Sequence, residues 1–301
     1  MIAKEEISSW FRSLQDDICQ AIEAEDGKAK FEEDNWQRGG GGGGRTRILQ
    51  HGNVIERGGV NFSEVFGVAS SFLTSQLETQ NKKQETTNFF ATGVSIVMHP
   101  QSPMVPIIHM NVRYFESGND KWFGGGIDLT PHYVNEEDAK HFHHALKNVC
   151  DKHHTTYYKE FKKWADEYFF ITHRNETRGI GGIFFDHLRI NEFSVQERFE
   201  FVKDVGNCFA PLYVSLMRKN KSLPYTDKEK QWQNIRRGRY VEFNLVYDRG
   251  TKFGLETNGR AESILMSLPP QANWNYNYQP KKGSAEEKTL TYLKKEIDWD
   301  N

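Results

Sequence analysis

The first pattern along the chain is helical. Apolar side chains recur every three or four residues from Ile7 onward, which predicts a helix over residues 4–25 with Ser8 or Ser9 as a candidate cap. Six consecutive glycines follow at 39–44. Because glycine loses the most backbone entropy on folding, such a run predicts either a flexible loop or a point where the backbone approaches another group closely.

From residue 87 onward the pattern becomes that of strands mixed with helices. Apolar runs bounded by Gly and Pro predict strands at 93–99, 106–116, 122–133, 180–186, 239–249 and near 253–257. Helical spacing predicts helices at about 135–150, 157–170, 195–219 and 284–296. Strands and helices come in blocks and do not alternate strictly. This arrangement favours an α+β fold with an antiparallel sheet, in a single domain over residues 1–301.

The composition is that of an ordinary globular protein, with 37% hydrophobic and 27% charged residues and a net charge of -2. This charge disfavours a nucleic-acid-binding protein, which usually carries a basic excess. Three cysteines without a CxxC pair favour free thiols in a reducing compartment. The N-terminal segment is acidic from Glu5, unlike a transit peptide, and no apolar stretch approaches the roughly 18 residues of a membrane span. We therefore expect a cytoplasmic protein with no membrane span.

The strand predicted at 106–116 carries the clearest chemical pattern. Side chains alternate between the two faces of a strand, so His109, Asn111 and Arg113 share one face. The other face is apolar and holds Ile108, Met110, Val112 and Tyr114. A solvated edge strand is the alternative, but exposed strand faces usually carry Thr, Lys, Glu or Ser. An imidazole, an amide and a guanidinium in a row favour a functional face. If this strand pairs with 93–99 as a hairpin, His99 approaches His109.

Acidic and basic groups elsewhere add candidate ligand contacts. Asp128 follows three glycines, so it either accepts hydrogen bonds from a ligand or caps a turn. Arginines cluster in the segments 173–182, 236–240 and 258–263. Guanidinium groups bind carboxylates through paired hydrogen bonds. Several such clusters in a chain that is not basic overall favour a polycarboxylate ligand, although each cluster alone is better explained as solvated loop charge.

Metal, nucleotide and serine-hydrolase sites receive little support. His99, His109, His143 and His173 could hold a metal, but their spacing matches no zinc motif. The run ending in Gly44-Arg45-Thr46 imitates a phosphate-binding loop, with Arg where Lys is required. The nucleophile motif GxSxG is absent from the chain.

Taken together, the motifs resemble one enzyme family. They are Ser95-x3-His99-Pro100-x2-Pro103-x2-Pro106-x2-His109-x-Asn111-x-Arg113-x-Phe115 and the segments 41–65, 122–133, 173–188 and 236–270. In this order they resemble the oxygen-dependent coproporphyrinogen III oxidases over nearly the whole chain. The resemblance implies a large flat antiparallel sheet flanked on both faces by helices. It also implies a homodimer, with a strand region around 239–270 at the interface.

The implied reaction is the oxidative decarboxylation of two propionates of coproporphyrinogen III to vinyl groups. Oxygen is the co-substrate, carbon dioxide and hydrogen peroxide are released, and the product is protoporphyrinogen IX. No organic cofactor is implied, and a divalent metal is implied only weakly. Two other classes remain open: a tetrapyrrole carrier without catalysis, and a histidine-ligated metalloenzyme.

The resemblance also assigns roles to residues. His109 matches a proton donor, Asp128 an acid that holds pyrrole N–H groups, and Arg113 a further catalytic position. Substrate contacts are implied for Ser95, Asn111, Val112, Arg113, Asn258, Gly259 and Arg260. His99, His109, His143 and His173 match positions sometimes assigned to a metal. On these roles, we expect Asp128→Ala and Arg113→Ala to lower turnover far more than stability.

Overall fold

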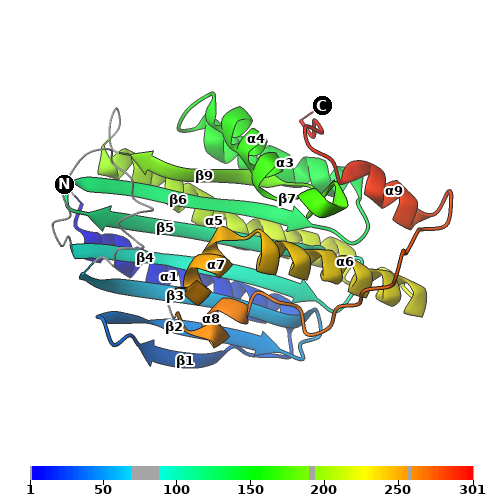
Figure 1. Ribbon diagram of the computed structural model, residues 1–301, viewed down its shortest axis with the longest axis horizontal. Helices are drawn as coiled ribbons and strands as arrows, with labels where there is room; N and C mark the ends of the chain where they lie inside the picture. The colour runs from blue at the N-terminus through cyan, green and yellow to red at the C-terminus, as the bar shows by residue number, and fades with distance from the viewer. Residues whose placement is uncertain (1, 69–87, 190–193, 257–258, 301) are drawn as a thin grey trace.

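The computed structural model describes residues 2–68, 88–189, 194–256 and 259–300, and a seven-stranded sheet forms its centre (Figure 1). The strand order is β1-β2-β3-β4-β5-β6-β9, and every neighbouring pair is antiparallel. The strands are β1 (Glu32–Gln37), β2 (Gly42–Gln50), β3 (Ile55–Val68), β4 (Asn88–Pro100), β5 (Ile107–Ser117), β6 (Asp120–Thr130) and β9 (Gly182–Arg189). A small sheet of β7 (Phe170–Ile171) and β8 (Glu176–Thr177) flanks the 3-10 helix η1 (Thr172–Arg174).

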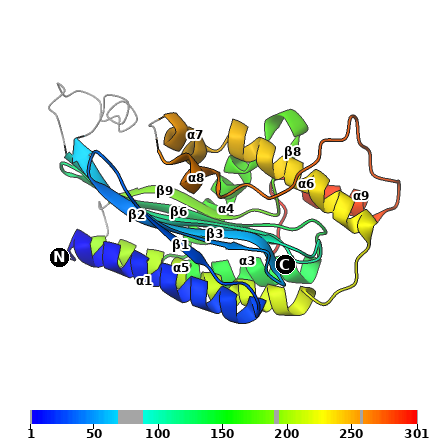
Figure 2. The ribbon, with the colours of Figure 1, turned by 90° about the horizontal axis from the view of Figure 1, so that it is seen from below.

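Helices cover both faces of the sheet (Figure 2). One face carries α1 (Lys4–Asp26), α3 (Glu136–Asp151) and α5 (Val195–Asn220), and the other carries α6 (Asp227–Val246), α7 (Arg249–Glu256) and α8 (Ala261–Leu265). Helix α4 (Tyr157–Tyr168) packs on the edge strand β9, and α9 (Ala285–Tyr292) lies near the end of the chain. The expected α+β fold, with an antiparallel sheet between helices, is confirmed.

The two faces of the central strands differ in chemistry. Even-numbered side chains of β4 and β5 pack with α1 and α5 in the main core; they include Ile96, Met98, Ile108, Met110 and Val112, all fully buried. Each such side chain contributes about 1.5–3 kcal/mol by leaving water. The odd-numbered face lies under α6, α7 and α8; Val97 and Ile107 pack there against Tyr240 of α6, and polar side chains occupy other positions of this face. Within the described ranges, no helix combines the length and apolar character that crossing a membrane requires.

The strands predicted at 239–249 and 253–257 are wrong, because these residues form the end of α6 and most of α7. The buried side chains Arg236, Arg237, Tyr240, Phe243 and Asn244 recur at helical spacing. A capping box of Thr226 and Glu229 starts α6 well before the predicted strand. The predicted caps at Ser8 and Ser9 are also wrong, since Ala3 is the N-cap of α1. Helix α9 ends at Tyr292, short of residue 296.

Strands β1 to β3 are among the elements that the sequence patterns do not predict, and the glycine run spans the turn between β1 and β2 and the start of β2. Gly41 and Gly42 turn the chain between β1 and β2 with φ values of +114° and +81°, which favour glycine. Gly44 lies in β2, where a Cβ atom would come within 2.3 Å of the Trp36 ring. Of the two interpretations offered for the run, close approach of the backbone is the one confirmed.

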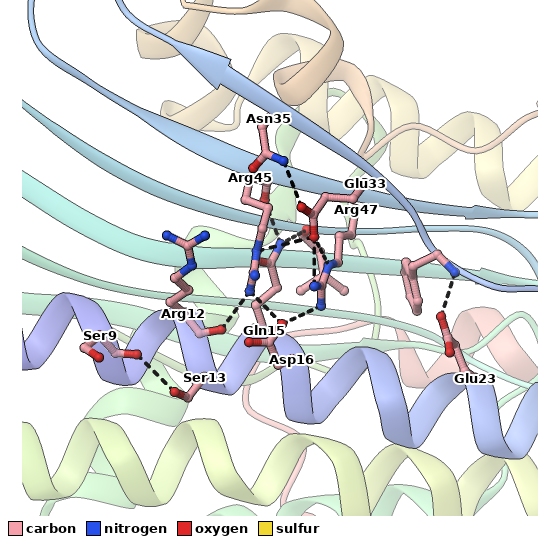
Figure 3. Close-up of polar contacts among 12 residues, drawn as sticks. Ser9, Arg12, Ser13, Gln15, Asp16, Glu23, Glu33, Asn35, Arg45 and Arg47 are labelled. Carbon is pink, nitrogen blue, oxygen red and sulfur yellow. Dashed lines mark hydrogen bonds and ion pairs between the residues drawn. The ribbon is translucent and has the colours of Figure 1, made fainter.

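The arginines after the glycine run connect β2 to α1 (Figure 3). Arg45 donates from Nε to Gln15 Oε1 at 2.6 Å and forms an ion pair with Asp16 at 2.7 Å. Gln15 is fully buried and donates to the backbone carbonyls of Arg45 and Val60 at 2.6 and 2.7 Å. Arg47 also pairs with Asp16, at 2.7 Å. These contacts lie on the core side of the sheet and explain both arginines structurally.

Candidate active site

The polar face of β5 forms the centre of the candidate site. Antiparallel pairing places Asp128 of β6 directly opposite His109, and Ser95 of β4 opposite Asn111. Residues that are direct cross-strand partners lie on the same face of the sheet. The predicted hairpin of β4 and β5 is therefore confirmed, and it gathers His109, Asn111, Asp128 and Ser95 on one face.

His109 and Asp128 form a directly hydrogen-bonded pair on this face. His109 Nδ1 lies 2.7 Å from Asp128 Oδ1; the His109 side chain is 20% exposed and the Asp128 side chain 1% exposed. A contact this short to an ionised carboxylate requires that Nδ1 carries the hydrogen. The second ring nitrogen, Nε2, then lies on the side away from the carboxylate, where it can exchange a proton with a ligand.

Arg178 is the second partner of Asp128, and sequence reasoning did not assign it to the site. It follows β8, and its Nη2 atom donates to Asp128 Oδ1 and Oδ2 at 2.7 and 2.8 Å. Burial raises the pKa of Asp128, but the charge of Arg178 and the hydrogen bond from His109 outweigh it and hold the pKa below its usual value. Asp128 is therefore an ionised carboxylate inside the protein.

Arg113 is an arginine on β5 whose guanidinium a ligand can reach. Its side chain is 33% exposed, and its guanidinium donates to Asn111 Oδ1 at 2.8 Å and Asp186 Oδ1 at 2.7 Å. It also lies 5.7 Å from the centre of the Trp122 ring. Two acceptors and an aromatic ring fix the orientation of the guanidinium plane, which suits it to bind a carboxylate in a defined position.

Glycines occupy the neighbouring positions on this face of the sheet. Gly93 of β4 and Gly124 of β6 both pair with Arg113, and Gly126 of β6 pairs with Asn111. All three lie on the polar face, where they add no side chain. The space over Gly124 is taken by the side chains of Asp186 and Arg113, and the space over Gly126 by Phe184, so the glycines let these side chains pack closely against the sheet.

The other predicted substrate contacts lie at different places. Val112 is fully buried in the core on the opposite face, so any contact with a ligand on the polar face would have to come from its backbone. Gly259 and Arg260 immediately precede α8, and Arg260 pairs with Asp34 of β1. Ser263 of α8 lies 2.9 Å from Thr46 of β2, which places α8 on the polar face. Asn258 lies outside the described residues.

The four candidate metal ligands do not come together. His99 is buried with Nε2 2.9 Å from Ser267 O, and His143 lies between Tyr158 Oη and Ile180 O, at 3.0 Å from each. Burial lowers the pKa of His99 and of His143 to about 3. His173 bonds to Glu242 and Tyr247, each at 2.7 Å. In the described part of the chain, no three His, Cys, Asp or Glu side chains are arranged to hold a metal ion.

The fold and the site define a class of α+β proteins in which one face of a wide antiparallel sheet carries an accessible arginine and a buried acid–imidazole pair. The chain belongs to the coproporphyrinogen III oxidase family, whose model matches residues 6–299.

Two plant proteins are similar to this chain. The first, from Glycine max, is named oxygen-dependent coproporphyrinogen-III oxidase, chloroplastic, and is 49% identical over 299 residues, covering 96% of this chain and 77% of that protein. The second, coproporphyrinogen-III oxidase 1, chloroplastic, from Arabidopsis thaliana, is 48% identical with the same two coverages.

Proposed function

We propose that this chain catalyses the oxygen-dependent conversion of coproporphyrinogen III to protoporphyrinogen IX. The supporting observation is the His109–Asp128 pair beside Arg113 on one face of the sheet, in a member of this family. Each propionate loses its carboxylate as carbon dioxide and a hydride equivalent from the carbon next to the ring, which leaves a vinyl group. Oxygen accepts the two electrons and, with one proton from the medium, leaves as hydrogen peroxide.

The site residues suit this chemistry. Arg113 has a fixed guanidinium for one propionate, and Arg260 offers a second cation over β1 of the same face. His109 can relay from the medium the one proton that the reduced oxygen takes up for each propionate. Porphyrinogen rings are electron-rich, so oxygen serves as the oxidant without an organic cofactor. The protein then contributes positioning and charge stabilisation.

The experiment is aerobic turnover of coproporphyrinogen III by chelator-treated protein, read as protoporphyrin fluorescence after chemical oxidation. We expect product in air and none in an anaerobic control. Product that appears only after a divalent metal is added back would assign the reaction to a metal-dependent enzyme. No product under any of these conditions, combined with tight binding of the porphyrinogen, would leave a tetrapyrrole carrier as the function.

We further propose that the chain acts as a homodimer through α6 and α7. The region expected at the interface is helical, and it exposes Leu245, Val246 and Leu255 by 43–46%. Exposed apolar groups of this kind are typical of contact surfaces. Light scattering after size exclusion should give a dimer mass for the wild type and a monomer mass for Leu255→Glu. Leu223→Glu, at a site equally exposed (45%) but between α5 and α6, is the control and should stay dimeric.

The cytoplasmic location stays a prediction, because both named relatives are chloroplastic proteins. Imaging of a tagged chain in its own cells tests it. Signal confined to an organelle would contradict the expectation.

A further inference from the structure

We propose that Arg178 is a positioning residue for the reaction: it holds Asp128 turned toward His109, so that Asp128 acts through the imidazole and does not contact the substrate. This inference rests on the proposed function, and it gives Asp128 a role different from holding pyrrole N–H groups. We call Arg178, Asp128 and His109 the polar triad.

The first support is that the carboxylate of Asp128 already accepts hydrogen bonds from within the protein. Its carboxylate accepts from His109 Nδ1 at 2.7 Å and from Arg178 Nη2 at 2.7 and 2.8 Å, and only 1% of the side chain is exposed. A carboxylate has about four lone-pair sites, so three are used. Because only 1% of the side chain is exposed, a pyrrole N–H group could reach the remaining site only if the groups that cover Asp128 moved. His109, with 20% of its side chain exposed, is the member of the triad that a substrate meets first.

The second support is how firmly Arg178 is held. Its guanidinium lies 4.4 to 4.7 Å from the ring centres of Phe169, Tyr240 and Phe243. Nη1 donates to Asn244 Oδ1 at 2.9 Å, and the side chain is 2% exposed. The surrounding groups come from the end of α4 and from α6, so two elements fix one cation. A guanidinium caged in this way has one orientation in which to present its N–H groups to Asp128.

A purely structural role explains this arrangement poorly. A buried ion pair is weak evidence for stability, since apolar residues of similar volume often serve as well. The position of the Arg178–Asp128 pair is better explained by its effect on the imidazole of His109. An ionised Asp128 accepts from Nδ1–H and leaves Nε2 to exchange the proton, whereas a protonated Asp128 would donate to Nδ1 and reverse the tautomer.

The ionisable groups around Asp128 set the expected pH dependence. His109 faces it from β5, Arg178 from the segment after β8, and Tyr240 from α6, while Asp248 ahead of α7 adds a negative charge felt by Arg178. Of these, Arg178 is the main cation that opposes the effect of burial on Asp128. Without it, burial should dominate, and Asp128 should take up a proton at a higher pH than in the wild type.

The test compares Arg178→Met, Arg178→Lys and Asp128→Asn with the wild type. We expect Arg178→Met to lower kcat by roughly 100-fold or more, with KM unchanged because Arg113 is intact. The kcat of Arg178→Met should recover as pH rises, because Asp128 then loses its proton. The pH profile of this variant should therefore show an acidic limb, whereas the profile of Asp128→Asn should show none. Arg178→Lys should restore part of kcat. The double variant Arg178→Met/Asp128→Asn should be no slower than Asp128→Asn alone, because both changes break one unit. Arg174→Met, in the neighbouring η1, is the matched control and should keep wild-type kcat.

The outcomes separate this inference from the proposed function. If the wild type itself does not turn over coproporphyrinogen III, the proposed function fails. The triad is then judged by the nitrogen and proton resonances of His109, which should show an Nδ1–H tautomer in the wild type and lose it in Arg178→Met. Any one of four results would overturn the inference. For Arg178→Met, they are a normal kcat, a change in KM alone, or a loss in kcat that multiplies with the loss caused by Asp128→Asn. For the wild type, the result is an Nε2–H tautomer of His109. If Arg178→Met does not fold, Arg178→Lys and Asp128→Asn carry the same comparison.

Discussion

Arg113 and Arg178 belong to the same face of the sheet, yet their surroundings give them different roles. Arg113 is 33% exposed and pairs with Asp186, which leaves part of its guanidinium open to a ligand. Arg178 is 2% exposed, and its nearest charge is the buried carboxylate of Asp128. Residue type is the same at both positions. The two arginines differ in how deeply each is buried and in which carboxylate each contacts. These differences leave Arg113 open to a ligand, while Arg178 can act only on Asp128.

This difference changes what alanine substitutions should do. We expect Arg113→Ala to lower kcat/KM about 100-fold, because it removes a charged contact in the site, while the free energy of unfolding stays within about 1 kcal/mol of the wild type. Asp128→Ala should in addition lower the free energy of unfolding by about 3–5 kcal/mol, because it leaves the buried Arg178 without a counter-charge. On this argument we expect a loss mainly of turnover for Arg113→Ala, and a loss of both turnover and stability for Asp128→Ala. Urea unfolding with kinetics on the folded fraction tests it; equal stability of the two variants would contradict this account.

At the scale of residues, the sequence predicts which side chains share the polar face of β5, but it does not predict which residues from other elements contact them. Alternation along one strand is a local pattern, so the sequence alone places His109, Asn111 and Arg113 together. Arg178 and Asn244 reach the same place from a loop and a helix, which no local pattern reveals. The arginine cluster at 173–182 is visible in the sequence as a set, and only the fold separates the buried Arg178 from the exposed Arg174.

At the scale of elements, prediction succeeds where the core imposes a regular period. Helix α1 buries one face, β5 alternates between buried and half-buried positions, and β6 is buried from Trp122 to Thr130; the sequence patterns locate all three and β4, although β4 begins earlier than predicted. β1 is exposed over most of its length and β2 begins with glycines, so neither shows the usual strand pattern. In α6, apolar residues between 240 and 246 imitate alternation, although burial follows a helical period. Tertiary packing overrides local preference in both places.

The attachment of α1 to β2 gives a prediction about stability alone. Gln15→Leu removes the donor to the carbonyls of Arg45 and Val60 and leaves Arg45 Nε without its acceptor (Figure 3). We expect a loss of about 2–5 kcal/mol in the free energy of unfolding, because buried polar groups lose their partners. Ser13→Ala, which removes an exposed bond on the same helix, should change it by less than about 0.5 kcal/mol. Both variants should keep wild-type kcat while folded, since α1 covers the opposite face.

Acid stability should depend on the contact between η1 and α6. Burial raises the pKa of Glu242, but hydrogen bonds from Arg174 and His173 outweigh it and bring the pKa to about 2, from a usual value of 4.5. A carboxyl group with a depressed pKa stabilises the fold above its unfolded pKa, and this contribution is lost as pH falls through the folded value. Wild type should therefore exceed Glu242→Gln in urea midpoint above pH 4.5, and the difference should vanish toward pH 2. Glu256→Gln, an exposed control, should show no such convergence; a pH-independent gap for Glu242→Gln would refute the assignment.

At the scale of the whole molecule, the wide sheet places two cations on one face, several strands apart. Arg113 lies on β5 and Arg260 at the start of α8, which contacts β2. Three strand intervals of about 4.8 Å separate β2 from β5, or about 14 Å in total. The strands between them present Ser95 and Asn61 in register on the same face. Such spacing suits a ligand with carboxylates at opposite edges, as a tetrapyrrole with several propionates has.

If the two arginines hold different propionates, their effects on kcat/KM should be independent. We expect Arg113→Ala and Arg260→Ala each to lower kcat/KM, and the double variant to show the product of the two losses to within about twofold, because sites more than about 10 Å apart rarely couple. Arg189→Ala, at the far edge where Arg189 pairs with Asp120, is the control and should leave kcat/KM unchanged. A double variant no worse than Arg113→Ala would mean that both arginines serve one carboxylate. The substrate would then occupy only the β4–β6 side of the face, and the wide sheet would need another explanation.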